Sequence, residues 1–152
     1  MAKRMVDFSF KRAPSLQVAT YEWKGPWKDG RIRTEFERVA RWASSKGLRT
    51  GRWMLIEPSM GKFRVAIEVK GRARGDGHVR VRTLPGSRVA SITFDPDAVS
   101  ARVVYHGLTD WLKWRRKDGE IKSVGVYREV YDGNPWTDSK AWARTEVQAV
   151  VR

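Results

Sequence analysis

Alternation of apolar and polar side chains defines most of the structural elements that this sequence predicts. Alternation at every second residue is typical of a strand with one buried face, whereas apolar residues three or four positions apart indicate a helix. The first pattern predicts eight strands, at residues 6–12, 16–23, 52–57, 62–70, 78–83, 87–94, 124–131 and from 141 to the C-terminus. The second pattern predicts two helices, at residues 31–46 and about 99–117.

The predicted elements follow the same order twice. Strand, strand, helix, strand and strand occur on each side of a connector rich in glycine and arginine at residues 71–77. A shift of 71 residues places Val18-Ala19 on Val89-Ala90, and a shift of 72 residues places Glu57 on Glu129. A repeated order with a nearly constant shift indicates an internal duplication.

These patterns together predict an α+β fold in a single domain, residues 1–152. It consists of two pseudo-symmetric ββαββ repeats, one at about 6–70 and the other at about 78–151, with antiparallel sheets and two long helices. We expect a ligand groove where equivalent faces of the two repeats meet, because ligand sites often form at such junctions.

The predicted strand at residues 124–131 carries the candidate chemistry. Its alternation places a mostly aliphatic set of side chains on one face, and on the other Gly125, Tyr127, Glu129 and Tyr131. A carboxylate between aromatic rings can hold a cation or an apolar ring, because ring faces carry negative potential and exclude water. The alternative is an ordinary half-exposed strand with a solvated glutamate.

Composition narrows the classes of function. The absence of cysteine excludes disulfides, thiolate catalysis and cysteine metal sites, and the wide separation of His78 and His106 argues against a histidine metal cluster. No apolar run approaches the roughly 18 residues that span a membrane, and the first residues lack the apolar core of a signal peptide. We therefore expect a cytoplasmic protein that binds neither a membrane nor a metal.

A formal net charge of +14, from 31 Lys and Arg against 17 Asp and Glu, leaves two interpretations open. One is a surface that binds nucleic acid or an acidic partner, and the other is a basic, well-solvated exterior. The basic residues are spread along the chain, and the sequence contains no helix-turn-helix, zinc-finger or RNP-like motif. Charge alone therefore identifies no site.

The sequence resembles the GyrI-like domain over about residues 6–151. The resemblance rests on the repeated ββαββ order, on the turn Gly25-Pro26-Trp27 before the first helix and on Glu129-Val130-Tyr131 in the penultimate strand. GyrI-like domains include the effector-binding domains of AraC- and MerR-type transcription regulators and the DNA gyrase inhibitor protein. The resemblance implies a pocket between the two repeats that binds lipophilic, often cationic molecules.

In GyrI-like domains a buried glutamate on the penultimate strand faces the ligand, and by position this residue would be Glu129. Tyr127 and Tyr131 would lie beside it on the same strand. The further pocket residues that the resemblance implies are Tyr21, Trp23, Trp53, Ile92, Phe94 and Tyr105. Core packing is the alternative for each aromatic residue, because aromatic residues at regular spacing usually pack inside a domain.

Three functions stay open at this point. The first is a stand-alone protein that binds a small hydrophobic or cationic molecule without a cofactor, with a separate DNA-binding regulator as a partner. The second, also implied by the resemblance, is a hydrolase of electrophilic cytotoxins, in which Glu129 is the general base and Tyr127 or Tyr131 donates a hydrogen bond. The third is a module that binds nucleic acid or protein through its basic surface.

Overall fold

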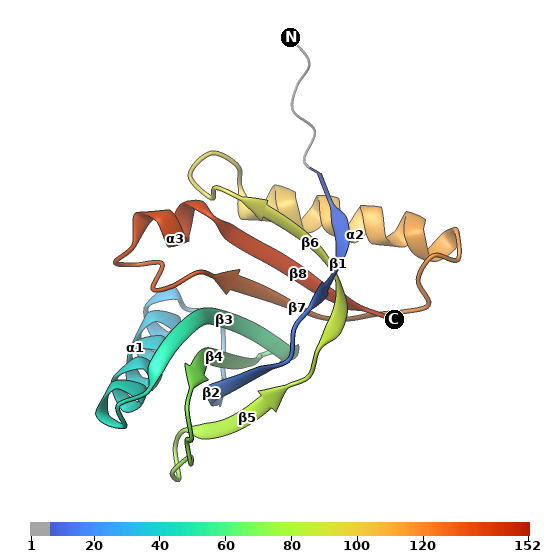
Figure 1. Cartoon of the computed structure of the whole chain (residues 1–152). Helices are drawn as coiled ribbons and strands as arrows, with labels where there is room; N and C mark the ends of the chain where they lie inside the picture. The colour runs from blue at the N-terminus through green and yellow to red at the C-terminus, as the bar shows by residue number, and fades with distance from the viewer. Residues whose placement is uncertain (1–6) are drawn as a thin grey trace.

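The computed structural model describes residues 7–152, which form one curled sheet and three helices (Figure 1). The elements in chain order are β1 (Ser9–Ala13), β2 (Leu16–Lys24), α1 (Asp29–Ser45), β3 (Arg49–Ser59), β4 (Lys62–Lys70), β5 (Arg80–Leu84), β6 (Ser87–Phe94), α2 (Ala101–Lys117), β7 (Val124–Tyr131), α3 (Ser139–Ala143) and β8 (Thr145–Val151). The strand order across the sheet is β1-β6-β8-β7-β3-β4-β2-β5, and every paired strand is antiparallel to its neighbour. The pair of β3 and β7 therefore joins the two halves of the chain at the middle of the sheet.

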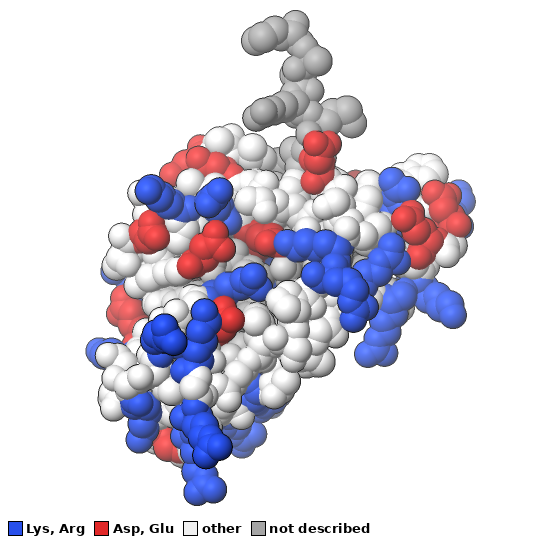
Figure 2. Space-filling view, viewed as in Figure 1, with Lys and Arg blue, Asp and Glu red and all other residues white. Residues whose placement is uncertain are grey.

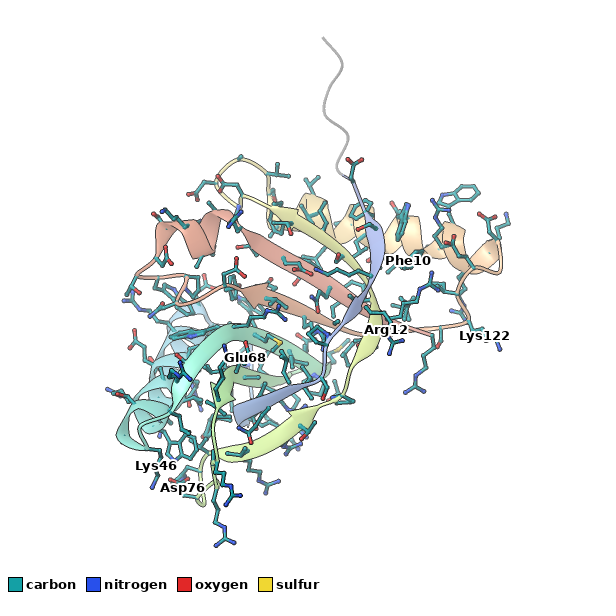
Figure 3. All side chains as sticks on the ribbon, in the orientation of Figure 1. Phe10, Arg12, Lys46, Glu68, Asp76 and Lys122 are labelled. Atoms are coloured by element: carbon teal, nitrogen blue, oxygen red, sulfur yellow. The ribbon has the colours of Figure 1, made fainter. Side chains whose placement is uncertain are left out.

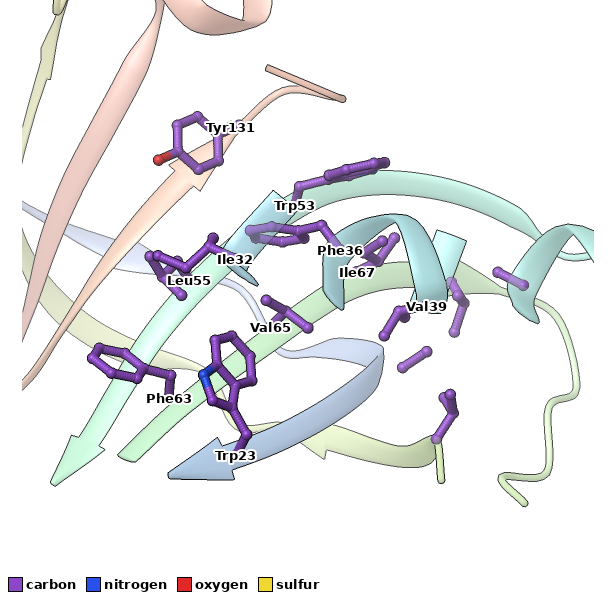
Figure 4. Packing of buried hydrophobic residues seen from close by; sticks show 14 residues of the cluster. Trp23, Ile32, Phe36, Val39, Trp53, Leu55, Phe63, Val65, Ile67 and Tyr131 are labelled. Carbon is purple, nitrogen blue, oxygen red and sulfur yellow. The ribbon is translucent and has the colours of Figure 1, made fainter. Parts of the chain in front are cut away.

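The first hydrophobic core lies between α1 and the strands β2, β3 and β4. α1 turns an apolar side toward these strands because Ile32, Phe36 and Val39 recur three or four residues apart along the helix. Phe36 is fully buried and stacks against Trp53, with ring centroids 5.2 Å apart and ring planes at 20° (Figure 4). Large aromatic side chains therefore fill much of the space under α1.

The second hydrophobic core lies under α2 and contains mostly aliphatic side chains. Val104, Leu108 and Leu112 recur at helical spacing on α2, and they are buried with Ile92 of β6 and Val147 of β8. The partly buried aromatic residues that pack against this core are Phe8, Phe10, Tyr105, Trp111 and Tyr127. The rings therefore lie mainly at its edge, in contrast to the core under α1.

The opposite face of the sheet carries a third, smaller core, formed by Val18, Met54, Ile56, Ala66 and Val130. Near this core Arg128 is only 4% exposed, and its Nε donates a hydrogen bond of 2.6 Å to Oε1 of Gln148. Burial lowers the pKa of Arg128, and the negative charge of Glu146 opposes that shift. Arg128, the polar exception on the aliphatic face of β7, is thus a buried cation.

The predicted strands and helices occur in the structure with shifted ends. α2 begins at Ala101 and not at Val99, because Ser100 has an extended backbone, with φ −61° and ψ 131°, and so lies outside the helix. The short helix α3, whose first turn is capped by Asp138, covers the end of the predicted loop and residues 141–143, which were predicted as the start of the last strand, so β8 begins only at Thr145. Val6, the predicted start of the first strand, lies outside the described residues.

The predicted separate sheets are in fact one sheet. β3 pairs with β7 through the register Trp53 with Tyr131 and Leu55 with Glu129, so strands from both halves belong to one hydrogen-bonded array.

None of the helices within residues 7–152 is long and apolar enough to cross a membrane.

Candidate ligand-binding site

Two adjoining cavities open beside β7, on the face of the sheet that carries α1 and α2. Their volumes are about 750 and 250 Å³. Both are lined by Trp27, Leu55, Ala101 and Glu129. Because Leu55 and Glu129 are paired across β3 and β7, the two cavities meet where the two halves of the chain join.

Acidic and aromatic residues characterise these cavities. The larger cavity is further lined by Glu57, Pro58, Tyr105, Gly125, Val126 and Tyr127. The smaller is further lined by Asp29, Ile32, Phe94, Pro96, Tyr131, Trp136, Trp142 and Thr145. No Lys or Arg of residues 7–152 lines either cavity, although the chain has 31 of them, so the local charge is negative in a strongly basic protein.

The carboxylate of Glu129 is held between two phenols. Tyr105 of α2 donates a hydrogen bond of 2.8 Å to Oε1, and the hydroxyl of Tyr131 donates to Oε2. One donor comes from a helix and the other from β7 itself, so the orientation of the carboxylate is fixed by two separate elements. Glu129 is half-buried at the boundary between the two cavities.

Burial and the adjacent carboxylate keep both phenols protonated. The pKa of Tyr105 and the pKa of Tyr131 are raised above the ordinary value, first because burial disfavours the phenolate and then because Glu129 is negatively charged. Both hydroxyl groups therefore act as hydrogen-bond donors to Glu129 at every pH near neutrality.

Tyr127 forms a wall of the larger cavity next to Glu129. Its ring stacks on Tyr105 with centroids 6.0 Å apart and planes at 16°, and its hydroxyl lies 3.0 Å from Oγ1 of Thr109. Gly125 is exposed at the edge of the same cavity, and a Cβ added there would find its nearest heavy atom 3.4 Å away. A methyl group at this position would thus meet only Val150, at ordinary contact distances.

Five of the nine predicted site residues border the cavities. Tyr105, Tyr127 and Glu129 line the larger cavity, and Glu129 also lines the smaller one with Phe94 and Tyr131. The alternation of β7 accounts for three of these five residues. Phe94 lies at the end of β6, and Tyr105 comes from the first turns of α2.

The other four predicted residues lie outside both cavities. Trp23 and Trp53 are buried in the core under α1, and Ile92 is buried in the core under α2. Tyr21 packs against Trp23 and borders a separate, polar hollow of about 280 Å³. Trp53 pairs with Tyr131 across β3 and β7, but its ring stacks on Phe36 and contributes to the core.

Several lining residues were not in the predicted set. Trp27 borders both cavities, is 53% exposed and donates a hydrogen bond of 2.7 Å from Nε1 to Asp29. Its one sequence signal is the turn Gly25-Pro26-Trp27, which precedes α1. Trp136 lies in the segment predicted as a loop, and Trp142 lies among residues that were predicted as a strand but form α3, so no pattern indicated either as a lining residue. Within residues 7–152, no three His, Asp or Glu side chains lie close enough to hold a metal ion.

The family model of the GyrI-like small-molecule binding domain matches residues 7–152. The chain belongs to the GyrI-like family. The resemblance seen in the repeated order of elements and in Glu129-Val130-Tyr131 is thereby confirmed. The sequence matches no curated protein.

Solved GyrI-like structures align with almost the whole chain. The C-terminal domain of EcmrR has a TM-score of 0.79 at 16% identity, covering 97% of this chain and 98% of that domain. EcmrR in its DNA complex has a TM-score of 0.73 at 16% identity, covering 96% of this chain and 57% of EcmrR.

Two further relatives are more distant. SAV2435 bound to tetraphenylphosphonium has a TM-score of 0.55 at 13% identity, covering 96% of this chain and 94% of SAV2435. A hydrolase encoded by lin2189 from Listeria innocua has a TM-score of 0.56 at 9% identity, covering 95% and 91% of the two chains. At these identities the similarities establish the fold.

Proposed function

We propose that this GyrI-like domain binds a small lipophilic molecule, cationic or neutral and aromatic, in the two adjoining cavities. Glu129 is its polar anchor. The observation that carries the proposal is the position of Glu129, which borders both cavities and has both carboxylate oxygens oriented by phenols.

The physical properties of the cavities suit such a ligand. A volume of about 750 Å³ lies within the range of about 300–1,000 Å³ that is common for small-molecule sites. Tyr105, Tyr127 and Trp27 offer broad ring surfaces that lose little side-chain entropy on binding. Glu57, Glu129 and Asp29 make the cavities negative, which favours a cation despite the positive charge of the whole chain.

Family membership and one structural relative support the choice of ligand class. The family is a small-molecule binding family, and the related SAV2435 was solved with tetraphenylphosphonium, an aromatic cation. EcmrR, which contains a domain of this fold, was solved with DNA. We extend the proposal to an effector-binding role in which a DNA-binding regulator receives the signal.

A fluorescence titration with tetraphenylphosphonium tests this function. Trp27 lines both cavities, so a bound ligand is expected to change the tryptophan emission of the wild type. Glu129→Gln should weaken binding by about tenfold or more, because it removes a carboxylate that contacts the ligand in a partly desolvated site. Glu57→Gln is the matched control, since Glu57 borders the larger cavity but is exposed, and a change of about threefold or less is expected.

Triphenylphosphine oxide, a neutral molecule with similar rings, separates charge from shape. The wild type should prefer the cation, and this preference should disappear in Glu129→Gln. Equal losses in the Glu129 and Glu57 variants would move the anchor away from Glu129. An absence of saturable binding by either probe would contradict the proposed function.

A hydrolase is the second candidate, and the arrangement of polar groups around the larger cavity favours it. Glu129 lies with Tyr127 and Tyr105 around one space, so a general base and hydroxyl donors could face the same substrate. The related lin2189 protein is a hydrolase. Turnover of a strained cyclopropane substrate by the wild type, lost in Glu129→Gln, would establish this activity, and binding without product would contradict it.

We also infer that the two halves arose by duplication and exchanged their first strands. From its two edges the sheet reads β1-β6-β8-β7 and β5-β2-β4-β3, so each strand has a counterpart at the same depth. A shift of 71 residues relates the pair Ala13–Ser87 of β1 and β6 to the pair Leu84–Leu16 of β5 and β2. An experimental structure whose halves fail to superpose under this shift would contradict the inference.

A further inference from the structure

A further concave surface lies where the end of β8 meets β7, and residues of β1 and β6 also line it. It has a volume of about 500 Å³ and is lined by Arg12, Leu84, Pro85, Gly86, Ser87, Arg88, Val126, Arg128, Val150, Val151 and Arg152. We call it the arginine groove, because four of its lining residues are arginines and none is Asp or Glu. Figure 2 shows Lys and Arg side chains gathered on the part of the surface where Figure 1 places the ends of β1 and β8.

The described residues place no carboxylate within ion-pair distance of these arginines. None of Arg12, Arg88, Arg128 and Arg152 forms an ion pair within residues 7–152, although seven other pairs are present there. Arg12 and Arg88 even occupy directly paired positions of β1 and β6, and like charges in such positions are destabilising. An anion between them would convert this repulsion into attraction.

The chain holds two of these arginines in place without neutralising them. The guanidinium of Arg88 lies over the ring of Phe10, 4.2 Å from the centroid, and Figure 3 labels Phe10 and Arg12 on the same strand. Arg128 donates to Gln148, and the nearby Glu146 already accepts from Lys11 over 2.8 Å and from Gln148 over 2.6 Å. A buried cation with only a neutral amide as partner is costly unless a further anion compensates it.

The rest of the lining is apolar except for Ser87 and contains no aromatic ring. Leu84, Pro85, Val126 and Val150 form an aliphatic wall beside the arginines. Single-stranded nucleic acid is usually held by aromatic rings on which bases stack, so this wall favours an aliphatic molecule instead. Ser87 also lines the groove, and its buried hydroxyl has no hydrogen-bond partner within residues 7–152.

We propose that the arginine groove binds an amphiphilic organic anion, with a phosphate or carboxylate head between Arg12 and Arg88 and an aliphatic body against Leu84, Val126 and Val150. Arginine suits such a head because its planar guanidinium donates paired hydrogen bonds to phosphate and carboxylate. The groove shares Val126 with the larger cavity, but none of its arginines lines a Glu129 cavity, and the proposal does not depend on the function proposed for those cavities.

Calorimetric titration with octyl phosphate at low ionic strength, below its micelle concentration, tests the proposal. The double variant Arg12→Gln/Arg88→Gln should weaken binding by about tenfold or more, because it removes charged hydrogen bonds to the head. The matched control is Arg41→Gln/Arg116→Gln, which removes the same charge from exposed positions on α1 and α2 and should change affinity by about twofold or less. Glu129→Gln should leave octyl phosphate binding unchanged and so separates this site from the proposed function.

Two further probes define the ligand class. Octyl phosphate should bind at least about tenfold more tightly than inorganic phosphate, because the aliphatic chain buries apolar area in the groove. Equal affinities for the two would overturn the amphiphilic part of the proposal. Equal losses in the two double variants, or no saturable binding of octyl phosphate, would overturn the site. The proposal would also be overturned if Arg12→Gln/Arg88→Gln lost binding of a single-stranded oligonucleotide but kept binding of octyl phosphate. The groove would then be a nucleic-acid surface.

Discussion

β3 and β7 run side by side at the middle of the sheet, but only β7 carries an oriented carboxylate. Glu57 of β3 lies 72 residues before Glu129 of β7, and both border the larger cavity. Glu57 is exposed and makes no side-chain hydrogen bond or ion pair within the described part of the chain, whereas Glu129 accepts from Tyr105 and Tyr131. The comparison shows that the surrounding donors, and not the residue type, distinguish the two glutamates.

The two strands also differ in how they use space. Trp53 of β3 is buried and stacks on Phe36 of α1, which fills the region under that helix. The residue 72 positions later is Gly125, and the residue 72 positions after Phe36 is Leu108, so the second half has two smaller side chains there. The larger cavity lies beside Gly125. One half thus has a packed aromatic pair where the other half borders the larger cavity.

Removal of the buried Trp53 side chain should have the largest effect of the changes proposed here. Trp53→Ala is expected to lower the free energy of unfolding by about 3–5 kcal/mol, because it removes a buried indole and leaves a cavity beside Phe36. Urea unfolding measures the loss, and Trp53→Phe, which keeps a ring, should lose less. Tetraphenylphosphonium binding to the folded variant should be retained, since Trp53 lines neither cavity. Loss of binding without loss of stability would place Trp53 in the ligand site.

The opposite change introduces a large side chain at Gly125, beside the larger cavity. Gly125→Trp is expected to weaken tetraphenylphosphonium binding by about a hundredfold or more, because the indole would occupy the volume that the ligand needs. Stability should change by about 1 kcal/mol or less, since the position is exposed. Gly125→Ala is the control, because its Cβ would meet only Val150 at ordinary contact distances. Unchanged affinity in Gly125→Trp would show that the ligand does not occupy the space beside Gly125.

The sequence predicts those features that depend on local periodicity. The alternation in β7 placed Tyr127, Glu129 and Tyr131 on one face, and the structure brings these three residues to the two cavities. Helical spacing likewise identified the buried sides of α1 and α2. In each case the burial of one face determines the pattern, so the pattern reveals the face.

Features that depend on how elements pack on one another were not predictable in this way. Trp53 has the alternation of a pocket residue, but the position of Phe36 above it determines that it belongs to the core. Trp27 lies between β2 and α1, and Trp142 lies in the short helix α3 where a strand was predicted, so no local period placed either residue at a cavity. The arginine groove combines residues from β1, β6, β7 and the C-terminal end of β8, which only the strand order brings together.

The smallest expected effect concerns pH and tests the donors that distinguish Glu129 from Glu57. The pKa of Tyr131 is raised in the folded chain, so above the ordinary value of 10.0 the unfolded chain loses this proton while the folded chain keeps it. The contribution of Tyr131 to stability is therefore complete below about pH 10 and declines as the pH rises further. The expected slope is roughly 1.4 kcal/mol per pH unit for this residue.

Tyr131→Phe should remove the part of the pH dependence that comes from Tyr131. Tyr105→Phe should remove the part that comes from Tyr105, whose pKa is raised for the same reasons. The measurement is urea unfolding of each variant and of the wild type at several pH values between about 9 and 11.5, which bracket the ordinary tyrosine pKa. Below pH 10 the difference between variant and wild type should be constant, because both states of the wild type are protonated there. Above pH 10 it should shrink, since only the wild type loses the contribution of that phenol. If the difference in unfolding free energy between variant and wild type stays constant across this range, the phenol titrates equally in the folded and unfolded states. Glu129 would then lack the protonated donor that distinguishes it from Glu57.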